Sequence, residues 1–435
     1  MRHWKAVTTS AATLIARLSS TAAMMVITFF ASRRLTREQF GLWMLLLALN
    51  QMTNGFDLGF QFTLGNRLAA LGALGPEGEE ERRETFLSIL FLEVLIVAVD
   101  TLLVLLLVPL IPWAHWFKIT DPLLAGQVVP LMPAILIVMI ATLPVQLIWT
   151  AFFAYREIKL ASSLTLLCNI TQTAIFVVAA YRCSFTNLVL VYFASNILFG
   201  LALTTYLFLR RRWRFAIPPL GRIIAIVRSM ARVSSHAFLL TISSLVGANL
   251  APVISGAVSG LVIAGDFTLV QKLFNFLLTA HLAILAPVSP TVTRESRAGH
   301  WDSVRERLRT CLLRIWPAFF FIPGALVWRL HPWLIRLWAG HPVTMYPVAA
   351  LLLAWACISG FVNTFSVFLN SLGLVKAQAA LSIAMILPAI LIPTLLGRWL
   401  GLWGIALGFI ICMVPGAIIL PLYTRRALRL HLLRV

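Results

Sequence analysis

The sequence predicts an all-α integral membrane protein with about twelve transmembrane helices, arranged as two six-helix lobes related by a pseudo-twofold repeat. Three observations lead to this fold class. First, 60% of the 435 residues are hydrophobic and only 11% are charged, whereas soluble domains carry about 25% charged residues. Second, the apolar residues gather in stretches of about 20, the length that crosses a hydrocarbon core of ~30 Å. Third, lysine and arginine concentrate in alternate connecting segments.

Twelve apolar spans account for nearly the whole chain and leave no stretch for a separate aqueous domain. Prolines such as Pro144, Pro388 and Pro415 predict kinks inside three of them, because an interior proline frees a backbone carbonyl. The spans centre on residues 10–32, 40–62, 86–111, 128–152, 160–180, 188–208, 234–255, 262–287, 312–332, 346–368, 378–397 and 402–423.

The distribution of positive charge predicts the orientation. With the N-terminus in the cytoplasm, the inner segments carry roughly three times as many lysines and arginines as the outer ones, which is the sign of a multi-pass chain with both termini cytoplasmic. The longest polar connector, residues 210–232, holds seven arginines. We interpret it as a cytoplasmic linker facing anionic lipid between lobes 1–209 and 233–435. A nucleic-acid patch is the weaker alternative for this segment, and we expect no nucleic-acid partner.

The two halves of the sequence share a pattern. A phenylalanine and, further on, an arginine occur at Phe40 and Arg67 and recur with the same spacing at Phe267 and Arg294. Each arginine precedes a charged segment that leads into a new apolar span, so we expect Arg67 and Arg294 to act as cytoplasmic gates or anchors. Repeats of six spans keep the same orientation and are related by an axis along the membrane normal.

Several stretches resemble one protein family over nearly the whole chain. They are RLTREQFGLW at Arg34–Trp43, FDLGF at Phe56–Phe60, AGDFTLVQKL at Ala264–Leu273 and LNSLGLVK at Leu369–Lys376. They resemble the polysaccharide-transporter branch of the multidrug/oligosaccharidyl-lipid/polysaccharide (MOP) exporter superfamily, to which MATE drug exporters also belong.

The resemblance implies a flippase of the bacterial inner membrane. Such a protein moves undecaprenyl-diphosphate-linked oligosaccharide from the cytoplasmic to the periplasmic leaflet for O-antigen or exopolysaccharide synthesis. Its partners would be the lipid-linked substrate, membrane lipids, a polysaccharide polymerase and chain-length proteins. It would need no cofactor.

Charges inside the spans are the candidate site. A charged side chain at mid-depth costs ~2.5–3.5 kcal/mol on insertion scales, so each needs a reason. Arg17 in the first span and Lys272 in the eighth could neutralise a pyrophosphate, because arginine binds phosphate bidentately and lysine acts as a point charge. Amides would receive the sugar, and the candidates are Gln51, Asn249 and Asn275.

Three carboxylates also fall in the spans. Asp57 lies in the second, and Glu93 and Asp100 lie in the third. They have two readings: coupling of transport to an ion, or a structural pair, such as a salt bridge between Asp57 and Arg17. For Arg17 and Lys272 the alternative interpretation is likewise a structural role in helix packing.

Two other functions stay open. A MATE-type, cation-coupled exporter of small molecules would need acidic groups in its cavity, whereas the mid-depth charges of the first and eighth spans are basic. A membrane-embedded polysaccharide polymerase or transferase would need a sizeable loop, and the connectors are short. The sequence has no Walker motif and no metal-ligand cluster, so we expect neither catalytic nor metal-binding residues.

Overall fold

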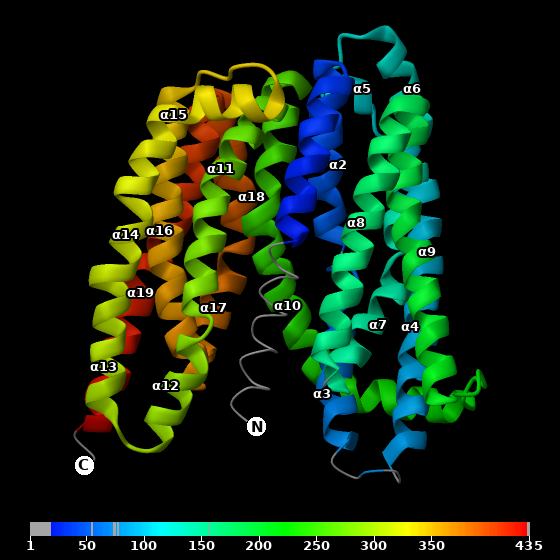
Figure 1. Cartoon of the computed structure of the whole chain (residues 1–435), viewed down its shortest axis with the longest axis vertical. Coiled ribbons are helices and arrows are strands. Elements are labelled where there is room, and N and C mark those ends of the chain that lie inside the picture. The colour runs from blue at the N-terminus through cyan, green and yellow to red at the C-terminus, as the bar shows by residue number, and fades with distance from the viewer. Residues whose placement is uncertain (1–18, 54, 73–74, 76–77, 156, 433–435) are drawn as a thin grey trace. The chain divides into compact units, whose positions relative to one another are not determined.

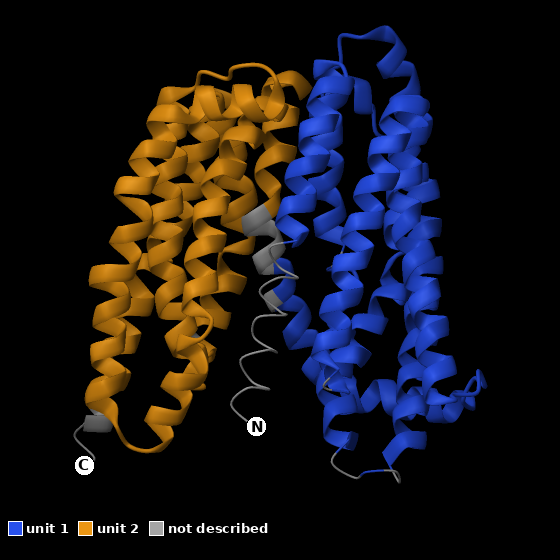
Figure 2. Ribbon diagram, viewed as in Figure 1, with its two compact units in different colours: residues 1–245 blue, residues 246–435 orange. Residues whose placement is uncertain are grey.

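The computed structural model describes residues 19–432 except 54, 73–74, 76–77 and 156. Within this part of the chain every regular element is a helix and no strand occurs (Figure 1). The chain forms two compact units, residues 1–245 (unit 1) and 246–435 (unit 2), coloured separately in Figure 2. The all-α fold class predicted from the sequence is therefore confirmed.

Unit 1 contains nine labelled helices and the first part of a tenth. Residues 19–34 are also helical. The labelled helices are α2 (Arg37–Thr53), α3 (Phe60–Leu71), α4 (Glu79–Leu107), η2 (Val108–Leu110), α5 (Trp113–Trp116), α6 (Pro122–Ile140), α7 (Leu143–Ala154), α8 (Ile158–Arg182), α9 (Phe185–Arg211) and α10 (Leu220–Ser259). Helix α10 begins in unit 1 and ends in unit 2, so residues 220–232 of the predicted linker form its first turns.

Unit 2 continues from the second part of α10. Its helices are α11 (Leu261–Leu285), α12 (Val288–Arg297), α13 (Trp301–Thr310), η3 (Cys311–Ile315), α14 (Trp316–Phe320), α15 (Ile322–Ala339), α16 (Tyr346–Ser371), α17 (Lys376–Ala384), α18 (Ile386–Leu400) and α19 (Leu402–Leu432).

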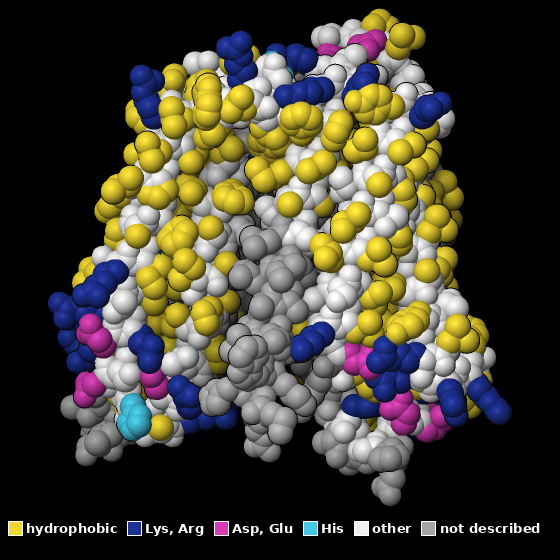
Figure 3. Space-filling view, in the orientation of Figure 1, with side chains coloured by type: hydrophobic (Ala, Val, Ile, Leu, Met, Phe, Trp, Pro, Cys, Tyr) yellow, Lys and Arg dark blue, Asp and Glu magenta, His cyan; other side chains and the backbone are white. Residues whose placement is uncertain are grey.

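The predicted spans correspond to these helices, with a break or a bend in some of them. Among the described residues, eight helices are long and apolar enough to cross a membrane, and a bent pair, α17 and α18, makes a ninth. Hydrophobic side chains cover the middle of each unit, and lysines and arginines gather at its ends (Figure 3). The fold is that of a multi-pass membrane protein.

One predicted span is interrupted. The second span was expected to run without a break over residues 40–62, but α2 ends at Thr53 and α3 begins at Phe60. Leu58 and Gly59 between them have φ angles of 52° and 79°, a left-handed conformation that a helix does not tolerate. A corresponding interruption in unit 2 separates α11 from α12 at Pro287.

A proline also explains the bend in the eleventh span. Helices α17 and α18 meet at an angle of 41° around Met385. Pro388 has no N–H to donate to the carbonyl of Ala384, so the hydrogen-bond ladder is cut at this point. Other prolines, among them Pro133 in α6 and Pro415 in α19, lie inside helices without ending them.

An apolar core holds the helices of unit 1 together around the interrupted span. Phe86 on α4, Phe152 on α7 and Leu207 on α9 are fully buried and belong to one cluster with Leu64 and Leu68 of α3. Burying a side chain of this size contributes about 1.5–3 kcal/mol. The short helix α3 is thereby fixed against α4 and α7, and its other face is left to line a cavity.

Candidate functional site

The interruption between α2 and α3 is stabilised by Asp57. One of its carboxylate oxygens, Oδ1, accepts the backbone N–H of Gly59 at 3.0 Å, and the other, Oδ2, accepts that of Gln61 at 3.1 Å. These amides belong to the first turn of α3, whose N–H groups have no partner within the helix. Asp57 thus holds the start of α3, and both of its oxygens are engaged by the backbone.

Gly59 allows α10 to come close to this turn. A Cβ atom at Gly59 would lie 2.2 Å from the backbone oxygen of Ser234 and 2.7 Å from the backbone nitrogen of Phe238. Because the obstacle is backbone, it cannot swing away as a side chain would. Next to this contact, Ser234 donates a hydrogen bond to Thr63 at 2.8 Å. Unit 1 therefore needs a glycine here for its helices to close.

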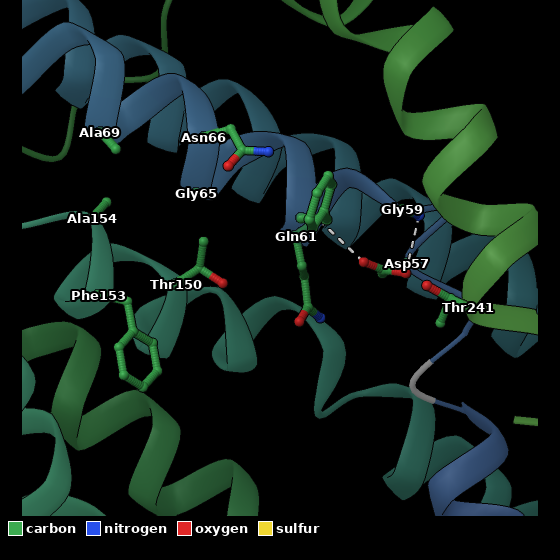
Figure 4. A pocket seen from close by; sticks show the side chains of 11 residues that line it. Asp57, Gly59, Gln61, Gly65, Asn66, Ala69, Thr150, Phe153, Ala154 and Thr241 are labelled. Carbon is green, nitrogen blue, oxygen red and sulfur yellow. Dashed lines mark hydrogen bonds between the residues drawn. The ribbon is translucent and has the colours of Figure 1, made fainter. Parts of the chain in front are cut away.

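A cavity of about 510 Å³ opens beside α3, between α7 and α10 (Figure 4). Its polar wall consists of one carboxylate, two amides and two hydroxyls: Asp57, Gln61, Asn66, Thr150 and Thr241. The Nε2 atom of Gln61 is buried and has no hydrogen-bond partner among the described residues. A buried donor without an acceptor costs about 1–3 kcal/mol. The amides and hydroxyls of the wall can both donate and accept hydrogen bonds.

Two further carboxylates lie on α4. Glu93 has no exposed surface, and neither of its oxygens has a hydrogen-bond partner in the described part of the chain. Asp100 lies two turns further along the helix, and its Oδ2 atom is likewise buried without a partner there. The charges that act on Glu93 are those of Asp57 and Asp100, both also negative. An unpaired buried carboxylate costs several kcal/mol when ionised, and no described residue compensates the charge of Glu93.

In unit 2 the unmatched charge has the opposite sign. Lys272 lies eleven residues after Leu261, about 16 Å along α11. This helix spans 25 residues, so Lys272 is near its middle. Its ammonium group has no hydrogen bond or ion pair with any described residue, and Asp266 on the same helix instead contacts His341 at 3.3 Å. A lone cation in a membrane span is a functional candidate.

Lys272 shares one face of α11 with other polar groups. Asn275 and Thr279 follow it at helical spacing and are partly or fully exposed. The opposite face, represented by Phe267, Phe274 and His281, is buried within unit 2. The core of unit 2 therefore leaves uncovered the face that carries the cation and the amide.

The remaining predicted residues are Arg17, two amides, and the two arginines expected to act as gates or anchors. Arg17 lies outside the described residues, so the proposed pair with Asp57 is not described either. Gln51 is exposed near the end of α2, and Asn249 is partly buried on α10. Arg67 donates hydrogen bonds to Ser229 at 2.5 Å and to Glu81 at 3.3 Å, whereas Arg294 is exposed on α12.

Sequence reasoning did not identify the cavity beside α3. Gln61, Asn66, Thr150 and Thr241 come from three separate helices, and nothing in their local sequence brings them together. One signal was present. The segment Asp57-Leu58-Gly59 inside an apolar run is a turn pattern, because aspartate binds the backbone two residues on and glycine permits positive φ. It marks the interruption on which the cavity depends.

Comparison with solved structures identifies the fold. The inward-facing conformation of a multidrug resistance MATE family transporter of the MOP superfamily is similar with a TM-score of 0.71 and 13% sequence identity, covering 95% of each chain. The outward-facing conformation of a transporter of this kind gives 0.61 at 13% identity, with 98% of this chain and 95% of the other covered.

A mutant of the MATE transporter VcmN of Vibrio cholerae gives a TM-score of 0.63 at 13% identity, covering 97% of this chain and 96% of that one. No family model and no curated protein sequence matches the chain. The similarity to these solved structures shows that the chain shares the all-α, two-lobe fold of MATE transporters, as expected from the sequence.

Proposed function

We propose that the chain is a transporter that moves an undecaprenyl-diphosphate-linked oligosaccharide from the cytoplasmic to the periplasmic leaflet of a bacterial inner membrane, by alternating access. The observation that carries the proposal is Lys272, a cation near the middle of α11 without a counter-ion among the described residues. The MOP fold supports a transporter, and an unmatched cation supports an anionic cargo.

The chemistry of the cargo fits the groups that are available. A diphosphate must keep its charge compensated when it leaves water, and Lys272 offers a positive charge at this depth. The glycan needs hydrogen-bond partners, which Asn275 beside Lys272 and the amides and hydroxyls of the cavity along α3 provide. The polyprenyl tail needs none and stays in the bilayer.

The energy source in this proposal is an ion gradient acting through unit 1. Glu93 is a buried carboxylate without a partner in the described part of the chain. Burial of Glu93 therefore costs least free energy when the carboxylate has bound a proton or lies beside a bound cation. Binding and release on opposite sides of the membrane would bias the conformational equilibrium.

Reconstituted protein provides the test. Purified protein in liposomes is given a fluorescent lipid-diphosphate oligosaccharide, and its appearance in the outer leaflet is followed with a membrane-impermeant quencher. Lys272→Ala removes one partner of a charge pair with the substrate, which costs 2–5 kcal/mol, so we expect a fall in rate of about thirtyfold or more. Lys272→Arg keeps the charge and should retain most of the activity.

The matched control is Lys376→Ala, which removes an exposed lysine at the start of α17. Its rate should equal that of the wild type. Equal rates for Lys272→Ala and Lys376→Ala would contradict the proposal, because the charge within α11 would then have no role in moving the cargo.

The second candidate function is export of small organic cations, coupled to an ion as in MATE-type exporters. The carboxylates Asp57, Glu93 and Asp100 in unit 1 favour it. The same liposomes loaded with a fluorescent organic cation distinguish the two functions. Efflux of the cation that Lys272→Ala leaves intact, without movement of the lipid-linked glycan, would support the exporter.

A further inference from the structure

Another cavity lies in unit 2, apart from the charges discussed so far. It has a volume of about 430 Å³ and is formed where α13, α16 and α19 meet. Its wall combines three arginines with buried apolar side chains: Arg305, Arg425, Arg429, Leu308, Phe365 and Leu428. None of the described residues that line it is a carboxylate, so this lining is cationic on one side and apolar on the other.

The two kinds of side chain are separated along the helices. On α19, Pro421 lies eight residues before Arg429, about 12 Å deeper in the span. On α16, Phe365 lies six residues before the last residue, Ser371, about 9 Å from the helix end. The arginines are thus at the mouth of the cavity and the apolar groups are within it, towards the middle of the membrane span.

The arginines are not neutralised by the protein. Arg305, Arg425 and Arg429 are exposed and form no ion pair with any described residue. The acidic residues nearest in sequence, Asp302 and Glu306 on α13, do not line the cavity. Three positive charges at one mouth repel one another, and a bound anion would relieve that repulsion.

We propose that this cavity binds an anionic phospholipid of the surrounding bilayer, with the phosphate between the three arginines and an acyl chain against Phe365 and Pro421. Arginine guanidinium groups hold phosphate through paired hydrogen bonds. Helices α16 and α19 are membrane spans, and their ends place the arginines where phospholipid head groups lie. Figure 3 shows basic side chains gathered at this end of unit 2, beside a hydrophobic surface.

The apolar wall favours a lipid over a free anion. Inorganic phosphate would satisfy the arginines but would leave Phe365, Leu308 and Leu428 facing an empty or water-filled space. A phospholipid fills both parts, and each buried methylene contributes about 0.8 kcal/mol. The site is independent of the transported cargo and does not rest on the function proposed above.

Native mass spectrometry of the full chain in detergent tests the proposal. The protein is titrated with dioleoyl phosphatidylglycerol, with dioleoyl phosphatidylcholine, and with sodium phosphate alone. We expect wild-type protein to retain one phosphatidylglycerol in preference to phosphatidylcholine. Arg425→Ala should weaken retention about fivefold, corresponding to about 1 kcal/mol for one arginine at an anionic surface. Arg305→Ala combined with Arg425→Ala should weaken it further.

Arg426→Ala is the matched control. Arg426 is the neighbouring residue on the same helix, is also exposed, and does not line the cavity. Its loss changes the net charge by the same amount and should leave retention within twofold of wild type. Equal losses for Arg425→Ala and Arg426→Ala would overturn the proposal in favour of diffuse attraction.

Competition identifies the source of the phosphate group. Displacement of phosphatidylglycerol by sodium phosphate alone, at concentrations comparable to the lipid, would overturn the lipid assignment and leave a simple anion site. Single-residue variants keep the test valid if the double variant does not purify as a monodisperse protein. The readout is binding and not transport, so its failure and that of the proposed flippase are separable.

Discussion

At the end that the arginine distribution predicts to be cytoplasmic, the two units are built differently. In unit 1, Arg67, Arg82 and Arg83 bind Glu81, Glu79 and Glu80, and arginines of α9 and α10 bind Glu157 and Glu84. In unit 2, the only such pair among the described residues joins Arg307 to Glu295. Counting arginines for topology treats both ends alike. In unit 1, Arg67, Arg211 and Arg222 bind carboxylates outside their own helices. In unit 2, Arg305, Arg425 and Arg429 form no ion pair with a described residue.

Inside the spans the contrast is one of sign. Unit 1 has carboxylates without a partner among the described residues, the buried Glu93 and the half-buried Asp100. In unit 2 the ammonium group of Lys272 has no ion pair with a described residue. Uncompensated charge in a membrane span is expensive, and the fold would be more stable without it. Under the function proposed above, the two units would have separate tasks, with ion coupling in unit 1 and cargo contact in unit 2.

The largest expected difference in stability between the two units concerns a glycine in a turn of each, Gly59 in unit 1 and Gly299 in unit 2. Gly59→Ala places a Cβ 2.2 Å from the Ser234 oxygen at a φ of 79°. Positive φ costs about 1–2 kcal/mol for an L residue and overpacking about 1–3 kcal/mol, so we expect a loss of about 3 kcal/mol or more. Unfolding in sodium dodecyl sulfate would measure it.

The control for this prediction is Gly299→Ala, in the turn between α12 and α13 of unit 2. Its φ is 78°, almost the same, but nothing lies within 4 Å of the added Cβ. Only the backbone cost of about 1–2 kcal/mol is expected there. Similar losses for the two variants would show that α10 does not press on the turn of unit 1.

Removing a carboxylate from the ion pairs of each unit should give a smaller difference in the free energy of unfolding. Glu79 accepts hydrogen bonds from Tyr155 at 2.6 Å, from Trp213 at 2.9 Å and from Arg82 at 3.3 Å. Hydrogen bonds to a charged group contribute about 1.5–3 kcal/mol each when buried. Because the Glu79 side chain is 34% exposed, we discount their sum and expect Glu79→Ala to cost about 2 kcal/mol by the same unfolding assay.

Glu295→Ala in unit 2 is the comparison for this prediction. Glu295 has a single ion-pair partner, Arg307, whereas Glu79 accepts from three side chains. The Glu295 side chain is 12% exposed and that of Arg307 is 44% exposed, and a pair open to solvent on one side contributes about 1 kcal/mol or less. If Glu295→Ala lowered the free energy of unfolding as much as Glu79→Ala, ion pairs would stabilise both units equally. The contrast between the units would then disappear.

The sequence predicts the fold because bilayer thickness and backbone satisfaction impose spans of similar length. Pro388 even marks the bend at Met385. The interruption at Asp57 is harder to predict, because Phe56, Leu58 and Phe60 continue the apolar pattern of the second span. The cavity beside α3 was not predictable, since Thr150 and Thr241 reach it only through tertiary packing.

For the candidate site, the sequence predicts which charges lie in the spans but not what surrounds them. The sequence predicts a pair between Asp57 and Arg17, and Arg17 lies outside the described residues. The sequence does not predict that the Asp57 oxygens accept the backbone N–H groups of Gly59 and Gln61. Glu93, interpreted as an ion-coupling residue or as a member of a structural pair, is fully buried with no partner in the described part of the chain. The hydropathy pattern predicts how deep in the membrane a charged residue lies. Its interaction partners depend on which helix faces pack against each other.

Glu93 gives the last and smallest of these effects. Glu93→Gln keeps the size of the side chain and removes its ionisable group. If unit 1 couples transport to an ion, the acceleration by an imposed proton or sodium gradient should fall about tenfold, within the range of 1–3 kcal/mol typical of coupling between sites. Stability should stay the same or rise, because an unpaired buried carboxylate is removed. Liposomes with and without a gradient provide the measurement.

Asp302→Asn, which neutralises an exposed acid on α13 of unit 2, should leave the response to the gradient unchanged. A Glu93→Gln protein that unfolds more readily yet responds normally to the gradient would assign the carboxylate to packing. If Glu93 couples the ion, Glu93→Gln lowers the gradient response and leaves stability equal or higher. If Glu93 only packs, Glu93→Gln lowers stability and leaves the gradient response unchanged. The two measurements together therefore decide whether the acids of unit 1 have a task separate from that of the lysine of unit 2.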